Sequence, residues 1–265
     1  MLWKALFCSL LLLVGTNTLS ASPTQELAAQ CFFTPPEGWE IADPSKLPGH
    51  VKISFYKKNS QCGFCPSINL AIEETSASLS EYLKAIKAIH EQDRTNRWRA
   101  LGKVRTAAGL AQLTEIDSTT EWGPVRILQI ILLKEGKAYV LTAAALKDEM
   151  SSFYKEFQSA FRSLTLSSDL VGNIPQLERR EKLKEKEQQL LKATLDSLSA
   201  DKSTSSKTSP FDSQLWLSFQ QMIIDDFKDM GAHWQILLLH GAREKILSLK
   251  AQHERTHVHP KHAPS

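Results

Sequence analysis

The sequence predicts an α+β fold, a mainly antiparallel sheet of about six strands covered by helices on both faces and followed by an α-helical C-terminal extension. Short strand-like runs follow one another between residues 51 and 144 without the regular strand–helix alternation of a parallel sheet. The nearly continuous apolar run at 125–133 is typical of a strand buried on both faces, which requires cover on both sides. After Leu170 the composition changes to Glu, Lys, Arg and Leu, which is typical of a solvated helix.

The six strands are predicted from alternating or continuous apolar residues of high β propensity. They occupy residues 51–56, 67–73, 101–107, 110–118, 125–133 and 138–144. The last two are joined by Lys134-Glu135-Gly136-Lys137, a turn sequence, and form the clearest hairpin of the chain.

Two helices are predicted inside this segment. Ser78 and Glu81 have the spacing of a capping box, and apolar residues at three- and four-residue steps follow them. The second helix covers about 148–163 and carries an aromatic stripe that we expect to face the core. The stripe consists of Phe153, Phe157, Phe161 and Leu164.

These segments together resemble the PsbP-like superfamily, which includes bacterial envelope proteins of the DcrB and LpqN kind and a eukaryotic Ran-binding factor. The resemblance is carried by PEGW at 36–39, SINLAIE at 67–73, the capped SLSEYL at 78–83, the hairpin GPVRILQIILL–KEGKAYVLTAAA and the terminal FRSLTL at 161–166. It implies a PsbP-like α+β domain within residues 22–170 that binds or stabilises a partner without catalysis. No binding residue is carried over from the superfamily. In overall style the chain also resembles uncharacterised exported proteins of chlamydiae.

Residues 1–21 are typical of a secretory signal peptide, with Lys4 before the short apolar run 6–14 and cleavage expected after Ser20 or Ala21. The alternative is an uncleaved anchor, although the run is shorter than the ~20 residues of a spanning helix. We therefore expect an exported chain, periplasmic or secreted or in the cell envelope, with no transmembrane segment after cleavage. Its 42% hydrophobic content excludes a fully disordered chain, and its net charge of +3 is too balanced for a dedicated nucleic-acid binder.

Cys62-Gly63-Phe64-Cys65-Pro66 is the motif with the clearest chemistry. Thiol–disulfide exchange favours a cysteine at a helix N-terminus, where the helix dipole stabilises the thiolate. Here a turn precedes the motif and the strand 67–73 follows it, which predicts a loop between two strands, and the resemblance places it in the same loop. A structural disulfide, with Cys31 as a further pairing option, is the preferred interpretation, and redox activity is the alternative.

No other catalytic motif is present, and a second cysteine pair for zinc is missing. The sequence therefore predicts a protein that is not an enzyme and needs no cofactor. The enzymatic alternative is an envelope thiol–disulfide oxidoreductase that uses Cys62 and Cys65.

The extension divides into a charged helix at 171–198, a flexible linker at 199–210 and an amphipathic helical segment at 211–252, capped by Asp212 and broken at Gly231 and Gly241. Its apolar stripe has three alternative counterparts: the rest of the chain, a partner or second copy, or a membrane surface, which the acidic residues of the polar face disfavour. The candidate partner-binding residues are Leu215, Phe219, Ile223, Phe227, Met230, Trp234 and Leu238.

A His-rich tail at 253–265 ends the chain and is expected to be disordered. His253, His257 and His259 are weak candidate metal ligands, but Pro260 and Pro264 indicate a frayed end, and no metal site is expected. The sequence thus predicts an exported, non-catalytic binding or scaffolding protein of the bacterial envelope that acts on an unidentified protein. The alternative is a secreted or surface protein that acts on a host partner through its C-terminal helices.

Overall fold

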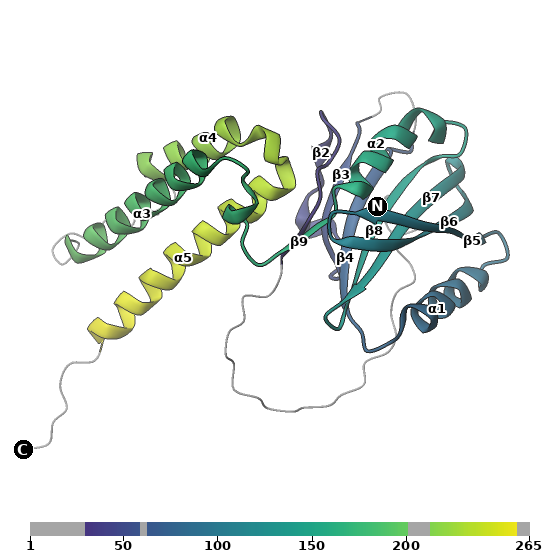
Figure 1. The fold of residues 1–265 in the computed structure, drawn as a ribbon, viewed down its shortest axis with the longest axis horizontal. Coiled ribbons are helices and arrows are strands. Elements are labelled where there is room, and N and C mark those ends of the chain that lie inside the picture. The colour runs from purple at the N-terminus through teal and green to yellow at the C-terminus, as the bar shows by residue number, and fades with distance from the viewer. Residues whose placement is uncertain (1–29, 59–62, 201–212, 259–265) are drawn as a thin grey trace, which may run out of the picture. The chain divides into compact units, whose positions relative to one another are not determined.

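The computed structural model describes residues 30–58, 63–200 and 213–258 (Figure 1). The chain divides into two compact units, of which the first ends at Leu166 and the second begins at Ser167. The predicted signal peptide 1–21 and residues 201–210 of the predicted linker lie outside the described residues. No helix in the described ranges is long and apolar enough to cross a membrane.

The first unit is built on a seven-stranded antiparallel sheet with the order β2-β3-β4-β8-β7-β6-β5. The bounds are Glu40–Ile41 (β2), Val51–Tyr56 (β3), Ser67–Glu74 (β4), Arg97–Thr106 (β5), Gly109–Thr120 (β6), Gly123–Lys134 (β7) and Lys137–Leu146 (β8). The six predicted strands are confirmed, and β2 is added. A separate two-stranded sheet pairs β1 (Gln30–Phe32) with β9 (Thr165–Ser167).

The β7–β8 hairpin closes through Glu135 and Gly136, which have φ angles of 53° and 71°. Positive φ at both central residues is the type I′ geometry, whose twist matches that of the flanking strands. Lys134 therefore pairs directly with Lys137, and β7 and β8 run in register down to the turn.

One face of the sheet is covered by α1 (Leu79–Glu91). Ser78 and Glu81 form the predicted capping box, which fixes the start of the helix. Tyr82 and Ile86 of α1 pack against apolar residues of β3, β4, β7 and β8. These residues are Val51, Ala71, Ile131, Ala138 and Val140.

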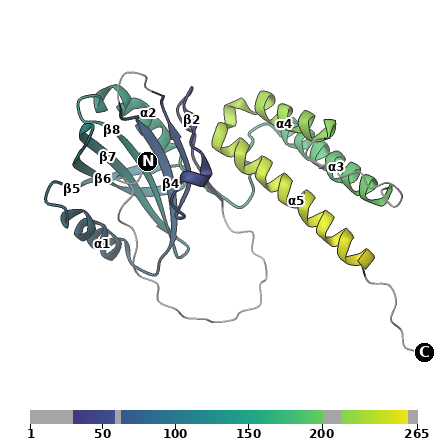
Figure 2. The same cartoon turned by 180° about the vertical axis from the view of Figure 1, so that it is seen from behind.

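The opposite face carries fully buried residues such as Leu70 and Ile130 and is covered by α2 (Met150–Arg162), which packs against β8 and β5. The predicted aromatic stripe faces the core, because Phe157 and Phe161 are fully buried. Trp39 lies edge-on to Phe157 at 5.8 Å between ring centroids. The predicted fold class, an antiparallel α+β sheet with helices, is therefore confirmed (Figure 2).

The second unit consists of α3 (Leu177–Ala200), α4 (Gln214–Asp226) and α5 (Ala232–Val258), which pack against one another. The indole nitrogen of Trp234 donates a hydrogen bond to the carbonyl of Leu170 at 3.1 Å, so Leu170 belongs with these helices. The unit boundary at Leu166/Ser167 therefore lies a few residues before the domain end expected at residue 170. Residues 199 and 200, expected in the linker, are the last residues of α3.

Two local predictions for this unit need correction or comment. Ser213 caps α4, whereas the predicted cap Asp212 lies outside the described residues. The chain breaks at Gly231, which has a φ of 83°, but Gly241 lies inside a continuous α5, and the predicted break there is wrong. A glycine costs a helix only about 1 kcal/mol, which the burial of Leu238 and Ile246 on either side offsets.

Candidate functional site

The most unusual feature of the first unit is a group of charged residues on one face of β5, β6 and β7. Arg97 and Arg99 alternate on β5 and lie directly opposite Asp117 and Glu115 of β6. Asp117 in turn pairs with Arg126 of β7. Residues two apart in a strand, and direct cross-strand partners, point to the same side of a sheet, so all five share one face. We call these five residues and Lys147, which follows β8, the charged surface.

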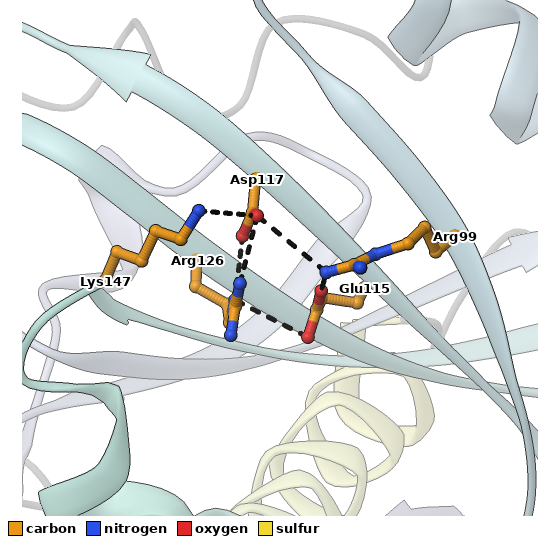
Figure 3. A network of polar contacts seen from close by, with 5 residues as sticks. All are labelled: Arg99, Glu115, Asp117, Arg126 and Lys147. Carbon is orange, nitrogen blue, oxygen red and sulfur yellow. Dashed lines mark hydrogen bonds and ion pairs between the residues drawn. The ribbon is translucent and has the colours of Figure 1, made fainter.

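The carboxylates of the charged surface are held by several donors (Figure 3). Arg126 donates from Nε to Asp117 Oδ1 at 2.7 Å and from Nη2 to Oδ2 at 3.0 Å. Lys147 Nζ donates to Asp117 Oδ2 at 2.9 Å. Glu115 forms an ion pair with Arg99 and lies 3.4 Å from the Nε of Arg126. All residues of the charged surface except Arg97 therefore form one connected network across three strands and the loop after β8.

The network is half-buried, and the attraction between its opposite charges is therefore stronger than it would be in water. The side chains of Glu115 and Asp117 are only 9% and 16% exposed. The hydrogen bond from Arg126, followed by that from Lys147, lowers the pKa of Asp117 to about 2, against the burial that raises it. The same pairing raises the pKa of Arg126. Asp117 is therefore ionised at every physiological pH, and it fixes the positions of two cations.

A depression of about 580 Å³ opens beside the network. It is lined by Glu91, Asn96, Arg97, Trp98, Arg99, Asp117, Arg126 and Lys147. Four of these residues are basic and two are acidic. Arg97 is exposed, and no hydrogen bond or ion pair joins its side chain to another described residue. Because guanidinium groups bind carboxylates and phosphates through paired N–H donors, the depression has the chemistry of an anion-binding surface.

The cysteine motif lies in the loop between β3 and β4, as predicted. Cys62 is outside the described residues, and β4 begins two residues after Cys65, so a strand and not a helix follows the motif. The loop is tightly packed: Phe64 is buried against Ile116 and Val125, and a Cβ at Gly63 would lie 2.5 Å from the ring of Trp122.

Cys31 and Cys65 are both free thiols in the described part of the chain, so the pairing of these two is not present. Cys31 lies in β1 and is buried, which raises its pKa to about 12. A thiol with so high a pKa carries almost no thiolate at neutral pH and is a poor nucleophile. The pairings that involve Cys62 stay a prediction.

The candidate partner-binding residues lie mostly in the interior of the second unit. Five of them are buried among α3, α4 and α5: Phe219, Ile223, Phe227, Trp234 and Leu238. Met230 is half-buried, and Leu215 is 52% exposed. The apolar stripe therefore packs against its own chain, the first of the three alternatives, and of the seven residues only Leu215 is openly presented to a partner.

Polar contacts hold the same helices together. Arg179 of α3 donates to both carboxylate oxygens of Asp229, at 2.6 and 2.9 Å, and lies over the ring of Phe227 at 4.8 Å. Lys182 donates to Asp226 at 2.9 Å. Asp226 and Asp229, two acidic residues of the polar face, are thus bound within the unit.

The His-rich tail is only partly described. His253 lies in α5, whereas the side chain of His257 and the whole of His259 are outside the described residues. Among the residues that the structure does describe, no three His, Cys, Asp or Glu side chains are grouped to hold a metal ion.

Comparisons with known proteins concern the fold. No family model and no curated protein matches the chain. Among solved structures it is similar to LpqN of Mycobacterium tuberculosis, a protein involved in cell envelope biogenesis, with a TM-score of 0.41, 13% identity and coverage of 53% of this chain and 84% of LpqN. It is also similar to the cyanobacterial PsbP of Synechocystis, with a TM-score of 0.38, 13% identity and coverage of 56% and 97%.

A third similar structure is the Ran-binding protein Mog1p of Saccharomyces cerevisiae, with a TM-score of 0.37, 17% identity and coverage of 51% and 89%. At these identities the likeness concerns the fold alone.

Proposed function

We propose that this chain is an exported binding protein, not an enzyme, and that its sheet unit recognises an acidic segment of a protein partner through the charged surface. The observation that carries the proposal is the excess of basic groups in the depression beside a fixed carboxylate network. Arg126 and Lys147 are held in place by Asp117, whereas Arg97 is exposed and Arg99 has a side chain that is 57% exposed. The charged surface thus presents two basic side chains in fixed positions, Arg126 and Lys147, and two accessible guanidinium groups, those of Arg97 and Arg99.

The arrangement supports binding more than catalysis. The low pKa of Asp117 leaves it without a proton to donate near neutral pH and makes it a weak base. Cys65 is followed by a strand, so it does not lie at a helix N-terminus, which is what activates a redox thiol. The predicted signal peptide supports export, because a chain that carries it would act outside the cytoplasm.

The test compares two double variants of equal charge. Arg97→Gln/Arg99→Gln removes two positive charges from the charged surface. Lys103→Gln/Arg105→Gln removes two from the same strand, but these residues pair with Gln112 and Leu110 of β6 and so lie on the other face. The chain from Ser22 to Ser265 and both variants are used to capture partners from an envelope extract, followed by titration of the captured partner at increasing salt.

We expect the wild-type chain and the Lys103/Arg105 variant to capture a partner that the Arg97/Arg99 variant does not bind. The affinity for this partner should fall as the salt concentration rises. Equal capture by all three chains, or capture that does not respond to salt, would contradict the proposal.

A further inference from the structure

The strand β5 lies at the end of the seven-stranded sheet and has β6 as its one partner strand within the described residues (Figure 1). Within the same residues, no main-chain hydrogen bond joins residues 97–105 to any segment other than β6. The outward N–H and C=O groups of an edge strand are available to pair with another chain. We call the side of β5 that faces away from β6 the open edge.

The main chain of the open edge is accessible. Seven of the ten residues of β5 are exposed, although α1 and α2 both contact this strand. Ala100 and Gly102 are among the exposed residues. A glycine has no side chain and an alanine has a single methyl group, so their exposure is largely exposure of the main chain. A second strand can therefore reach the hydrogen-bonding groups in the middle of β5.

The charges along the open edge are all positive. β5 contains four basic residues and no acidic one: Arg97, Arg99, Lys103 and Arg105. Like charges directly opposite each other destabilise a pair of strands, and opposite charges stabilise it. Charged residues on an edge are also a means by which proteins prevent their own edges from pairing. The charges of β5 therefore disfavour a second copy of this strand and favour an acidic strand.

The open edge and the depression beside the charged surface meet at the first half of β5. A bulge between Ala100 and Gly102 ends this half, which pairs with β6 without interruption and carries Arg97 and Arg99 on the face of the charged surface. The depression is lined by Arg97, Trp98 and Arg99, three consecutive residues whose side chains alternate between the two faces. The depression therefore reaches the main chain of β5 in the half that carries the two arginines.

We propose that the acidic segment bound by the charged surface lies in extended conformation along the first half of the open edge, as an added strand whose acidic residues recur at every second position. This inference rests on the proposed function and adds the conformation and the sequence pattern of the partner. Main-chain hydrogen bonds to β5 supply affinity for any sequence. The alternate side chains that face Arg97 and Arg99 supply the selection.

The two faces of the sheet differ beside this half, which makes the spacing of the acidic residues decisive. On one face an added strand meets Arg97 and Arg99. On the other face it meets Trp98, which packs against the apolar Ile116 and Val125. A carboxylate on that face loses water without gaining a counter-charge. Two adjacent acidic residues therefore do not both find a basic partner, whereas two that are separated by one residue do.

The experiment uses the chain from Ser22 to Ser265 and four peptides of equal charge, each acetylated and amidated at its ends. The parent peptide is Thr-Glu-Thr-Glu-Thr-Glu-Thr, and Thr-Thr-Glu-Glu-Glu-Thr-Thr has the same composition with the acids adjacent. The other two are the parent N-methylated at its glutamates or at its inner threonines, which removes donors and no charge. The N–H groups of alternate residues in a strand point to the same edge, so one of these two sets faces β5 and the other faces solvent.

Binding is followed by chemical-shift titration and by hydrogen exchange of the β5 amides. We expect the parent peptide to bind saturably and to protect the outward amides of residues 97–100. The peptide with adjacent acids and one of the N-methylated peptides should bind roughly tenfold more weakly, and the other N-methylated peptide should bind as the parent does. Arg97→Gln/Arg99→Gln should lose binding of the parent, whereas Lys103→Gln/Arg105→Gln, beyond the bulge and on the other face, should keep it.

The outcomes separate this inference from the proposed function. If both N-methylated peptides bind like the parent while Arg97→Gln/Arg99→Gln abolishes binding, the charged surface acts without the open edge, and the inference alone fails. If the arginine variant binds the parent peptide as the wild type does, the proposed function fails with it. Absence of binding by the parent peptide, or a dimer in which the outward β5 amides are already protected without peptide, would also overturn the inference.

Discussion

Arg126 binds both carboxylate oxygens of Asp117, its direct partner on the neighbouring strand, at 2.7 and 3.0 Å. This bidentate pair links β6 to β7 through their side chains as well as their backbones. It also holds Arg126 and Lys147 at the edge of a depression that two further arginines line. The pair thus has a structural role in the sheet and a positioning role for the proposed partner surface.

Asp117→Asn should lower the free energy of unfolding by about 1–3 kcal/mol, because the half-buried guanidinium of Arg126 loses its bidentate charged partner and keeps only the longer ion pair with Glu115. Urea denaturation measures this effect. Asp148→Asn is the control, since Asp148 is exposed in the loop before α2 and should change stability by less than about 0.5 kcal/mol. Equal stability of the two variants would show that the network contributes nothing to the fold.

Trp39 connects the N-terminal segment to α2 through its ring and its indole nitrogen, which donates to Glu156 at 3.0 Å. Trp39→Ala should destabilise the first unit by about 3–5 kcal/mol, whereas Trp39→Phe, which keeps an aromatic ring, should cost about 1–2 kcal/mol. Thermal denaturation of the two variants checks the order. A smaller loss for alanine than for phenylalanine would refute the packing described here.

The second unit should lose stability in acid through His233. Burial lowers the pKa of this side chain to about 3, so the folded state holds it neutral while the unfolded state is protonated below about pH 6.5. The stability that His233 contributes is complete above pH 6.5 and falls as the pH drops towards 3. Circular dichroism of α-helix melting at pH 7 and pH 4 measures this, and His233→Gln should show a smaller difference. If His233→Gln lost as much stability between pH 7 and pH 4 as the wild type does, the acid sensitivity would not come from His233.

The thiols of Cys31 and Cys65 should differ in their reactivity. Cys31, buried and with a raised pKa, should resist iodoacetamide in the native chain and react once the chain unfolds, whereas the half-buried Cys65 should react more readily. Mass spectrometry of digested samples locates the label. For the enzymatic alternative, an insulin-reduction assay should give the same rate with the wild type and with Cys62→Ser, and a clear loss in the variant would revive a redox function.

The sheet was predictable because its apolar periodicity is strong, and the hairpin at Glu135–Gly136 because its turn chemistry is specific. The short β2 was missed, since two residues carry no period. The predicted third strand began at Leu101, which left Arg97 and Arg99 outside it and concealed the charged face of β5.

The charged surface could not be located from one sequence, because it depends on strand register. The alternation of Arg97 and Arg99 and that of Glu115 and Asp117 was a readable signal, but their pairing follows from which strands are neighbours. In the same way Gln129 and Thr142 each look like a single polar interruption of an apolar strand until the register aligns them. The burial of Phe227 and Trp234 also depends on tertiary packing that periodicity does not identify.

The central claim is that the sheet unit, not the helical unit, carries partner binding. The most direct measurement compares three chains for affinity to the captured partner by calorimetry: residues 22–265, residues 22–166, and residues 22–166 with Arg97→Gln/Arg99→Gln. The account predicts that residues 22–166 bind with an affinity close to that of the longer chain and that the double variant loses binding. Binding that disappears with residues 167–265 and is indifferent to the two arginines would contradict it.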